Sequence, residues 1–174
     1  MTNDKEIFLV DSNSFMTPFR FYYAFDLVPA YWKELTKHID TGRVVVLDIV
    51  KDEIIKGNDE LAFWMSDLTN LKVIPRVTSD TVNKYQEVIQ YIETCGLYKE
   101  SALQTWAQSN VADPWLIAAA KANGFTIVTE EKMSGGVSRK TPNKGAKIPD
   151  VAMHFGVRTI DIYQMMRKLE IQIK

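Results

Sequence analysis

The sequence Ile7-Phe8-Leu9-Val10-Asp11 is a short run of apolar, β-favouring residues that ends in a carboxylate. Such a brief run predicts a buried strand rather than a helix, because helices usually continue for about ten residues or more. A second run, Val44–Leu47, has the same form and is followed directly by Asp48, which we expect to cap the next helix. The residues that follow each strand are therefore the first place to look for function.

Further apolar runs and helical segments extend this pattern along the chain. The other predicted strands are Leu71–Ile74, Phe125–Thr129 and Val157–Ile160. The predicted helices are residues 26–40, 48–55, 58–69, 78–93, 99–108, 113–122 and 149–155, and a last helix capped by Asp161. This alternation predicts an α/β fold with three α/β/α layers and a central, mostly parallel sheet of about five strands. In such sheets a ligand site lies beyond the carboxyl ends of the strands.

The composition is typical of a globular protein, with 46% hydrophobic and 25% charged residues in a chain of 174. We expect one domain over residues 1–174. The single cysteine, Cys95, excludes an internal disulfide, and no Cys/His pattern suits zinc. Residues 1–6 lack a signal-peptide pattern, and no apolar stretch reaches the roughly 20 residues of a membrane span. We therefore expect a cytoplasmic protein without a membrane partner. The net charge of −1 argues against non-specific coating of nucleic acid.

Acidic residues recur where the predicted strand ends lie. They are Asp11, Glu53, Asp113, Glu130 and Glu131. Carboxylates that converge at one edge of a sheet repel one another unless a divalent cation neutralises them. An all-oxygen set suits Mg²⁺ or Mn²⁺ rather than zinc, and phosphodiester hydrolysis is a chemistry that uses such a set.

Each acid also has a plainer interpretation. Asp11 fits a turn or a helix cap, and Asp113 followed by Pro114 is typical of an N-cap before the first helical position. Glu53 fits a solvated helix position, and Glu130 and Glu131 fit a solvated loop. The hypothesis of a metal site therefore rests on the joint placement of the acids, and not on any one of them.

Four short motifs, in order along the chain, resemble those of PIN-domain nucleases. The motifs are Ile7–Phe15, Val50–Ile54, Ala112–Ala120 and Val128–Glu131. The resemblance extends from Ile7 to about Met166, and a Lys-Ile-Pro-Asp-Val element at Lys147–Val151 is similar to that of a bacterial PIN-like branch. It implies metal ligands and a catalytic role at Asp11, Glu53, Asp113 and Glu131. It further implies that Thr129 orients a carboxylate or a water molecule by a hydrogen bond.

The fourth motif departs from the family, because glutamate stands where aspartate is usual. The ligand there is Glu130 or Glu131, and the spacing favours Glu131. Asp150 follows an inserted loop and is an alternative or additional ligand. A plainer interpretation is that Asp150 stabilises the start of a helix beside Pro149. The sequence favours neither this role nor that of a metal ligand.

The resemblance implies a metal-dependent endoribonuclease with Mg²⁺ or Mn²⁺ as cofactor and RNA as substrate. It also implies the toxin role of a toxin–antitoxin pair, with a protein antitoxin as partner, and it leaves a homodimer open. The alternative is a catalytically silent PIN-like module that binds RNA or protein. A phosphatase of the haloacid dehalogenase type is a third hypothesis. Asn13 argues against it, because that class needs a second aspartate at this position.

Residues 132–147 are rich in cations and contain no acid. The cations are Lys132, Arg139, Lys140, Lys144 and Lys147. Glycine and proline within the segment predict a flexible loop. These side chains, together with Asn13, are candidates for binding substrate phosphates. An ordinary solvated loop is the plainer interpretation.

Residues 15–32 hold eight aromatic side chains. Such rings stack on unpaired bases or form a groove for a partner helix, but core packing is the favoured role for most of them. Arg20, Tyr22 and Tyr23 are the candidates for exposure. We expect Trp64, Trp106 and Trp115 to pack in the core or between helices.

Overall fold

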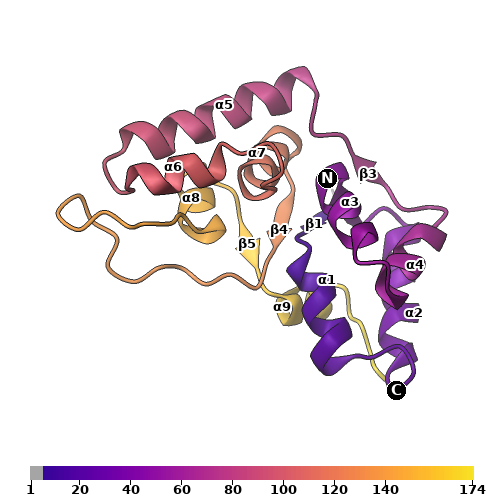
Figure 1. The fold of residues 1–174 in the computed structure, drawn as a ribbon. Coiled ribbons are helices and arrows are strands. Elements are labelled where there is room, and N and C mark those ends of the chain that lie inside the picture. The colour runs from indigo at the N-terminus through magenta and orange to yellow at the C-terminus, as the bar shows by residue number, and fades with distance from the viewer. Residues whose placement is uncertain (1–5) are drawn as a thin grey trace, which may run out of the picture. The chain divides into compact units, whose positions relative to one another are not determined.

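The strand β1 lies at the centre of a five-stranded sheet in this computed structural model, with the strand order β3-β2-β1-β4-β5. Figure 1 traces the chain and labels β1, β3, β4 and β5. The strands are β1 (Phe8–Val10), β2 (Val44–Leu47), β3 (Val73–Ile74), β4 (Thr126–Val128) and β5 (Thr159–Ile160). All run parallel, and Phe8 pairs with Val44 on one side and Thr126 on the other. The structure describes residues 6–174, so residues 1–5 of the polar N-terminal stretch lie outside it. The predicted α/β class and parallel sheet are confirmed.

Helices occupy the connections between the strands. They are α1 (Asn13–Thr17), α2 (Pro29–Asp40), α3 (Asp48–Lys56), α4 (Glu60–Asp67), α5 (Ser79–Thr94), α6 (Glu100–Trp106), α7 (Asp113–Asn123), α8 (Ile148–His154) and α9 (Ile162–Lys168). A π-helix, η1 (Pro18–Tyr22), follows α1. Every predicted helix is present, whereas α1 and η1 were not predicted. Within the described part of the chain, no helix is both long and apolar enough to cross a membrane.

Two predicted N-caps are wrong by one residue. The structure places Asp48 and Asp113 inside the first turn of α3 and α7, and the capping positions belong to Leu47 and Ala112. The helix α7 begins at Asp113, and the preceding residue, Ala112, already has helical backbone angles (φ −77°, ψ −28°). The predicted cap at Asp161 is confirmed, because its side chain accepts a hydrogen bond from the Gln164 backbone in a capping box.

Contacts divide the described chain into two compact units. The first comprises residues 6–75, Thr126–Glu130 and Ile160–Lys174, and the second comprises Arg76–Phe125 and Glu131–Thr159. The first unit contains β1 to β4 with α1 to α4 and α9, and the second contains α5 to α8. The single domain expected from the sequence stays a prediction.

The core of the first unit is built on strands that are buried on both faces. Residues Val44–Leu47 of β2 are fully buried, and α2 and α3 both pack against this strand. Such burial explains why the strands read as continuous apolar runs and not as alternating ones. Trp32 stacks on Phe25 with ring centroids 4.3 Å apart and meets Trp64 edge-on at 4.9 Å. Core packing of these aromatic residues is therefore confirmed.

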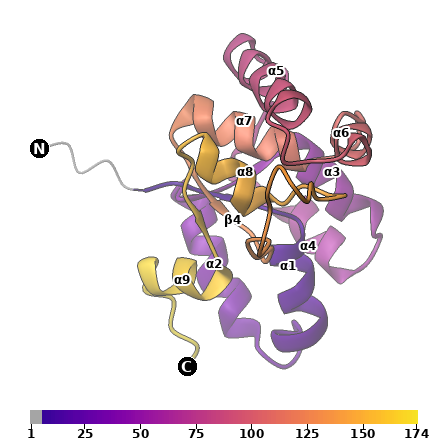
Figure 2. The ribbon, with the colours of Figure 1, turned by 90° about the vertical axis from the view of Figure 1, so that its left-hand side faces the viewer.

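The core of the second unit lies around α7. Figure 2 shows α5 and α8 beside this helix, and both contact it. Tyr85 of α5 stacks on Trp115 of α7 with centroids 3.9 Å apart, and Trp106 of α6 is buried. These contacts confirm helix packing for the tryptophans of this unit.

Candidate functional site

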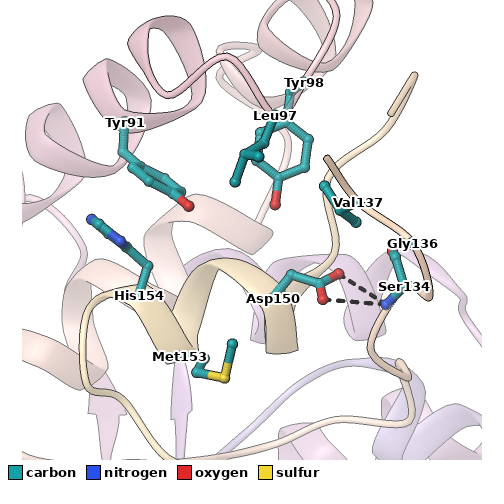
Figure 3. A pocket seen from close by; sticks show the side chains of 9 residues that line it. All are labelled: Tyr91, Leu97, Tyr98, Ser134, Gly136, Val137, Asp150, Met153 and His154. Carbon is teal, nitrogen blue, oxygen red and sulfur yellow. Dashed lines mark hydrogen bonds between the residues drawn. The ribbon is translucent and has the colours of Figure 1, made fainter. Parts of the chain in front are cut away.

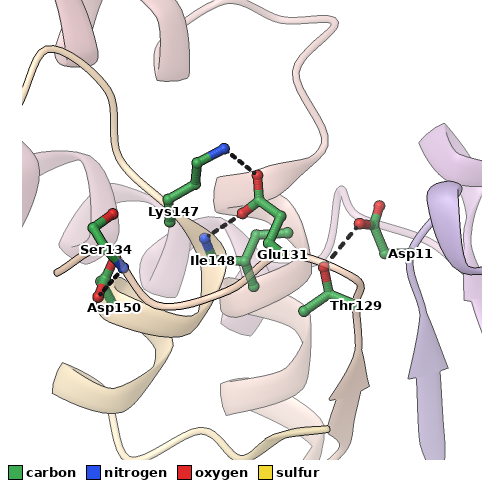
Figure 4. Close-up of polar contacts among 7 residues, drawn as sticks. All are labelled: Asp11, Thr129, Glu131, Ser134, Lys147, Ile148 and Asp150. Carbon is green, nitrogen blue, oxygen red and sulfur yellow. Dashed lines mark hydrogen bonds and ion pairs between the residues drawn. The ribbon is translucent and has the colours of Figure 1, made fainter. Parts of the chain in front are cut away.

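Asp11 is a buried carboxylate at the carboxyl end of β1. Its backbone N–H donates to the Val128 carbonyl over 2.9 Å, so the pairing with β4 continues up to the acid. The residue is only 5% exposed. Its Oδ1 accepts a hydrogen bond from the Ser12 backbone N–H at 2.7 Å. Its Oδ2 accepts one from the Thr129 hydroxyl at 3.2 Å, which Figure 4 shows. Such partners offset the cost of burying a charged group.

Thr129 is held in place from its own backbone. It is 3% exposed, and its N–H donates to the Ile160 carbonyl at 3.0 Å. Position 129 is thereby tied to β5, while the threonine hydroxyl reaches the carboxylate that follows β1. Thr129 therefore orients Asp11, which is the contact that the sequence resemblance implies for this residue. Its role in catalysis stays a prediction.

The second strand end also carries an acid. Asp48 follows β2 directly, is half-buried, and accepts a hydrogen bond from the Ile49 N–H at 2.7 Å. This contact repeats the one between Asp11 and Ser12 on the neighbouring strand. Sequence reasoning assigned Asp48 to capping alone, although its place after a buried strand was the signal that could have added it to the candidates. Glu53 lies further along α3 and is exposed.

The third predicted ligand belongs to the other unit. Asp113 is half-buried at the first position of α7, followed by the buried Pro114. Among residues 6–174, no group of three or more His, Cys, Asp or Glu side chains is arranged to hold a metal ion. The metal site therefore stays a prediction, with Asp11 and Glu53 in the first unit and Asp113 in the second.

Glu131 makes two contacts within the second unit (Figure 4). Its Oε1 pairs with the Lys147 ammonium at 3.1 Å, and its Oε2 accepts the Ile148 backbone N–H at 2.7 Å. Ile148 is the first residue of α8, so this carboxylate satisfies a backbone donor at the helix start. Sequence reasoning missed this structural role, because the partners lie 16 and 17 residues further along the chain.

Glu130 lies in the first unit and is half-buried. The pKa of Tyr31 is raised, mainly by complete burial of its ring and then by the nearby Tyr23 and Glu130. A carboxylate close to a buried phenol opposes ionisation of that phenol. The choice between Glu130 and Glu131 as the fourth ligand stays open.

Asp150 connects α8 to the basic loop. Both of its oxygens accept the Ser134 backbone N–H, at 3.2 and 3.0 Å. The contact supports the plainer role that the sequence left open for this residue, since it stabilises the chain around α8. Its role as a metal ligand stays a prediction.

The basic loop has no regular structure but is tied to the second unit at several points. Ser101 donates to the Lys144 carbonyl at 2.8 Å, and the Arg139 side chain donates to the Cys95 carbonyl at 3.1 Å. The five cations of the loop are exposed, and so is Asn13 at the start of α1. Phosphate binding by these side chains stays a prediction, as does flexibility of the loop.

The aromatic stretch ends in a partly exposed π-helix. Arg20 and Tyr22 are exposed, as expected, whereas Tyr23 is half-buried and stacks on Tyr31 with centroids 4.4 Å apart. Phe21 was not expected at the surface but is 73% exposed. A π-helix changes the angular spacing of side chains, so an argument from helical periodicity misplaces them here.

The fold and these contacts define an α/β protein whose central parallel strand ends at a buried, oriented carboxylate. Residues 8–173 match the family described as Domain of unknown function (DUF4411), and the chain belongs to this family. No curated protein matches the sequence.

Among solved structures, a similar fold occurs in the crystal structure of VapBC2 from Rickettsia felis bound to a DNA fragment from their promoter. The TM-score is 0.54 at 14% sequence identity, and the match covers 89% of this chain and 98% of that one. At this identity the likeness concerns the fold alone.

Proposed function

We propose that this chain is a PIN-type endoribonuclease that hydrolyses RNA phosphodiester bonds with Mg²⁺ or Mn²⁺. The observation that carries the proposal is the Asp11 carboxylate, buried at the end of the central strand and oriented by Thr129. Ligand sites of parallel α/β sheets lie at this end of the strands. Catalytic groups also work best when neighbouring groups fix their position.

The candidate ligand atoms are of the type that Mg²⁺ and Mn²⁺ bind. Carboxylate oxygens are the ligands that Mg²⁺ and Mn²⁺ prefer. Asp11 supplies them from a site with little solvent, and Glu53 and Asp113 are the further ligands that the sequence predicts. When bound, a divalent ion supplies Lewis-acid chemistry for phosphodiester hydrolysis.

The chain's own groups have separate tasks in this proposal. The Ser12 N–H and the Thr129 hydroxyl hold the two oxygens of Asp11 in fixed directions. The exposed cations Lys132, Lys140 and Lys144 supply positive charge for the RNA backbone. The small net charge of −1 is compatible with an enzyme that contacts only a few phosphates.

The test is cleavage of mixed structured and single-stranded RNA by the purified chain with Mg²⁺, with Mn²⁺ and with EDTA. We expect metal-dependent cleavage that falls by a factor of about 100 or more in Asp11→Asn. Asp26→Asn is the matched control, because it removes the same charge from an exposed position of the same unit. Equal cleavage by the Asp11→Asn variant, or cleavage that persists in EDTA, would contradict the proposal.

A catalytically silent module that binds RNA or protein is the second candidate. The observation in its favour is Glu131, whose two oxygens contact Lys147 and the start of α8. Filter binding with labelled RNA separates the candidates. A silent module retains RNA in Mn²⁺ and in EDTA and leaves it intact, whereas the nuclease shortens it in Mn²⁺ alone.

We further propose that the chain is the toxin of a toxin–antitoxin pair. The resemblance to PIN-domain toxins supports this, and the similar fold in the VapBC2 structure agrees with it. Expression of the wild-type chain in a bacterial host should stop growth, and expression of Asp11→Asn should not. The product of an adjacent gene should restore growth and co-purify with the chain. Arrest by both forms of the chain would argue against nuclease toxicity.

A further inference from the structure

The second unit contains a cavity of about 420 Å³ (Figure 3). It is bordered by the end of α5, the segment Leu97–Tyr98, the loop segment Ser134–Val137 and α8. This volume lies within the range of roughly 300–1,000 Å³ that is usual for small-ligand pockets. The mechanism proposed above uses none of its aromatic side chains.

The polar lining of the cavity includes one carboxylate, Asp150, and the hydroxyl groups of Tyr91 and Tyr98, all of which can accept hydrogen bonds. Figure 3 shows the hydroxyl groups of Tyr91 and Tyr98 directed into the space beside Asp150. An ionised carboxylate offers about four acceptor positions, and the single Ser134 N–H that contacts Asp150 leaves acceptor capacity. Burial is the main cause that raises the pKa of both tyrosines above its ordinary value.

The walls of the cavity are aromatic and apolar. His154 stacks on Tyr91 with centroids 3.8 Å apart, and Leu97, Val137 and Met153 complete the lining. None of the described residues that line the cavity is lysine or arginine. The loop that supplies Val137 does contain a guanidinium, but that of Arg139 donates to the Cys95 carbonyl instead. The cavity thus combines one carboxylate with aromatic rings and has no lysine or arginine among its described lining residues.

We propose that this cavity binds the guanidinium group of an arginine side chain. A guanidinium carries five N–H donors in a plane and stacks on aromatic rings, so it complements both the acceptors and the walls. The single charge of the lining, on Asp150, attracts a cation and repels a phosphate. A free arginine-like molecule and an arginine of a protein partner present the same chemistry. The proposal competes with a role of Asp150 as a metal ligand, and it does not require nuclease activity.

The first experiment titrates the full chain with blocked arginine, N-acetyl-arginine amide, and follows backbone amide signals by NMR. We expect shifts around Ser134 and Gly136 with a dissociation constant of about 1 mM, a free energy of about −4 kcal/mol. Blocked citrulline has nearly the same shape without the charge and should bind at least tenfold more weakly. Blocked lysine should be intermediate, because an ammonium lacks the planar donor set.

Variants assign the binding to this cavity. Asp150→Asn removes the charge at constant size and should weaken arginine binding at least tenfold, and Tyr98→Leu should weaken it severalfold. Glu93→Gln, an exposed position of α5 in the same unit, is the control and should bind like the wild type. Because Asp150 also holds Ser134, thermal melts check folding, and Tyr98→Phe tests the hydroxyl alone with the ring kept.

The source of the guanidinium is distinguished with an unstructured peptide that carries one arginine. A peptide that binds at least tenfold more tightly than blocked arginine indicates a protein partner, and equal affinities indicate a free small molecule. The proposal is overturned if blocked citrulline binds with the same affinity as blocked arginine. It is also overturned if Asp150→Asn leaves the affinity for blocked arginine unchanged. Tighter binding of guanosine monophosphate than of blocked arginine also overturns it and identifies a nucleobase pocket.

Discussion

Asp11 differs from an ordinary surface aspartate in its burial and in the hydrogen bonds to both of its carboxylate oxygens. It is almost completely buried, and donors from its own turn and from the segment after β4 hold its two oxygens. The donor from Thr129 joins residues 118 positions apart in the chain. Local turn geometry explains the Ser12 contact, but only the paired strands explain the second one. This long-range support is what distinguishes an oriented carboxylate from a simple turn residue.

Removal of the Thr129 hydroxyl should therefore lower activity more than stability. Thr129→Val keeps the shape but leaves one oxygen of Asp11 without that donor, and we expect RNA cleavage to fall about tenfold in a Mn²⁺-dependent assay. Thr126→Val is the control, because Thr126 begins β4 but donates to Glu6 at 2.8 Å. Equal losses of activity in the two variants would show that Thr129 has no special role.

The fourth acid can be assigned with a substitution that keeps its hydrogen bond to the start of α8. Glu131→Gln retains an oxygen for the Ile148 N–H but loses the charge and the exposed contact with Lys147. If Glu131 is the ligand that the sequence spacing favours, Mn²⁺ affinity measured by calorimetry should fall about tenfold with little change in melting temperature. An unchanged Mn²⁺ affinity together with a lower melting temperature would show that Glu131 only stabilises the start of α8 and does not bind the metal. Glu130→Gln and Asp150→Asn would then be the variants to test.

His38 should make stability depend on pH. Burial, and then the nearby Arg43, lower its pKa below the ordinary value of about 6.5. As the pH falls through 6.5, the unfolded chain gains a proton that folded His38 resists, so folding stability falls. In thermal melts, the loss between pH 7.5 and 5.5 should be smaller for His38→Gln than for the wild type. His154→Gln, at the other histidine, should retain the His38 contribution, and an identical loss in His38→Gln would refute this assignment.

At the scale of elements, apolar runs were the most reliable guide. Val44–Leu47 was predicted with its observed bounds, because a strand buried on both faces leaves a continuous apolar signal. Residues 13–22 gave no such signal, since α1 and η1 are short and Pro18 begins the second of them. The alternation of the elements also predicted where the strands end, and so which acids of the sequence follow a strand directly. The contact of Glu131 with α8 lies beyond sequence patterns, because it depends on how an irregular loop folds back.

The capping box of α9 offers a test at this scale. Asp161 accepts the Gln164 N–H at 2.8 Å, and the Gln164 side chain accepts the Asp161 N–H at 3.0 Å. Asp161→Ala should cost about 1 kcal/mol, which corresponds to roughly 2–4 °C in melting temperature for a chain of this size. Asp161→Asn keeps a capping oxygen and should lose less. A melting temperature unchanged by Asp161→Ala would show that the cap contributes nothing measurable.

At the scale of the whole molecule, the tryptophans allow a test of the single-domain expectation. Trp32 and Trp64 belong to the first unit, and Trp106 and Trp115 belong to the second. A variant with phenylalanine at positions 106 and 115 reports on the first unit by fluorescence, and the converse variant reports on the second. One cooperative domain should show fluorescence and circular dichroism midpoints that coincide in each variant. Separate midpoints would indicate two domains.

The proposed nuclease function requires that Asp11 belong to a divalent-cation site at which RNA is cleaved. The most direct measurement is a calorimetric titration of the full chain with Mn²⁺, with Asp11→Asn and the control Asp26→Asn alongside. We expect saturable binding to the wild type and the control, and at least tenfold weaker binding to Asp11→Asn. Equal Mn²⁺ affinity in all three proteins, or no binding to any of them, would contradict the proposed function.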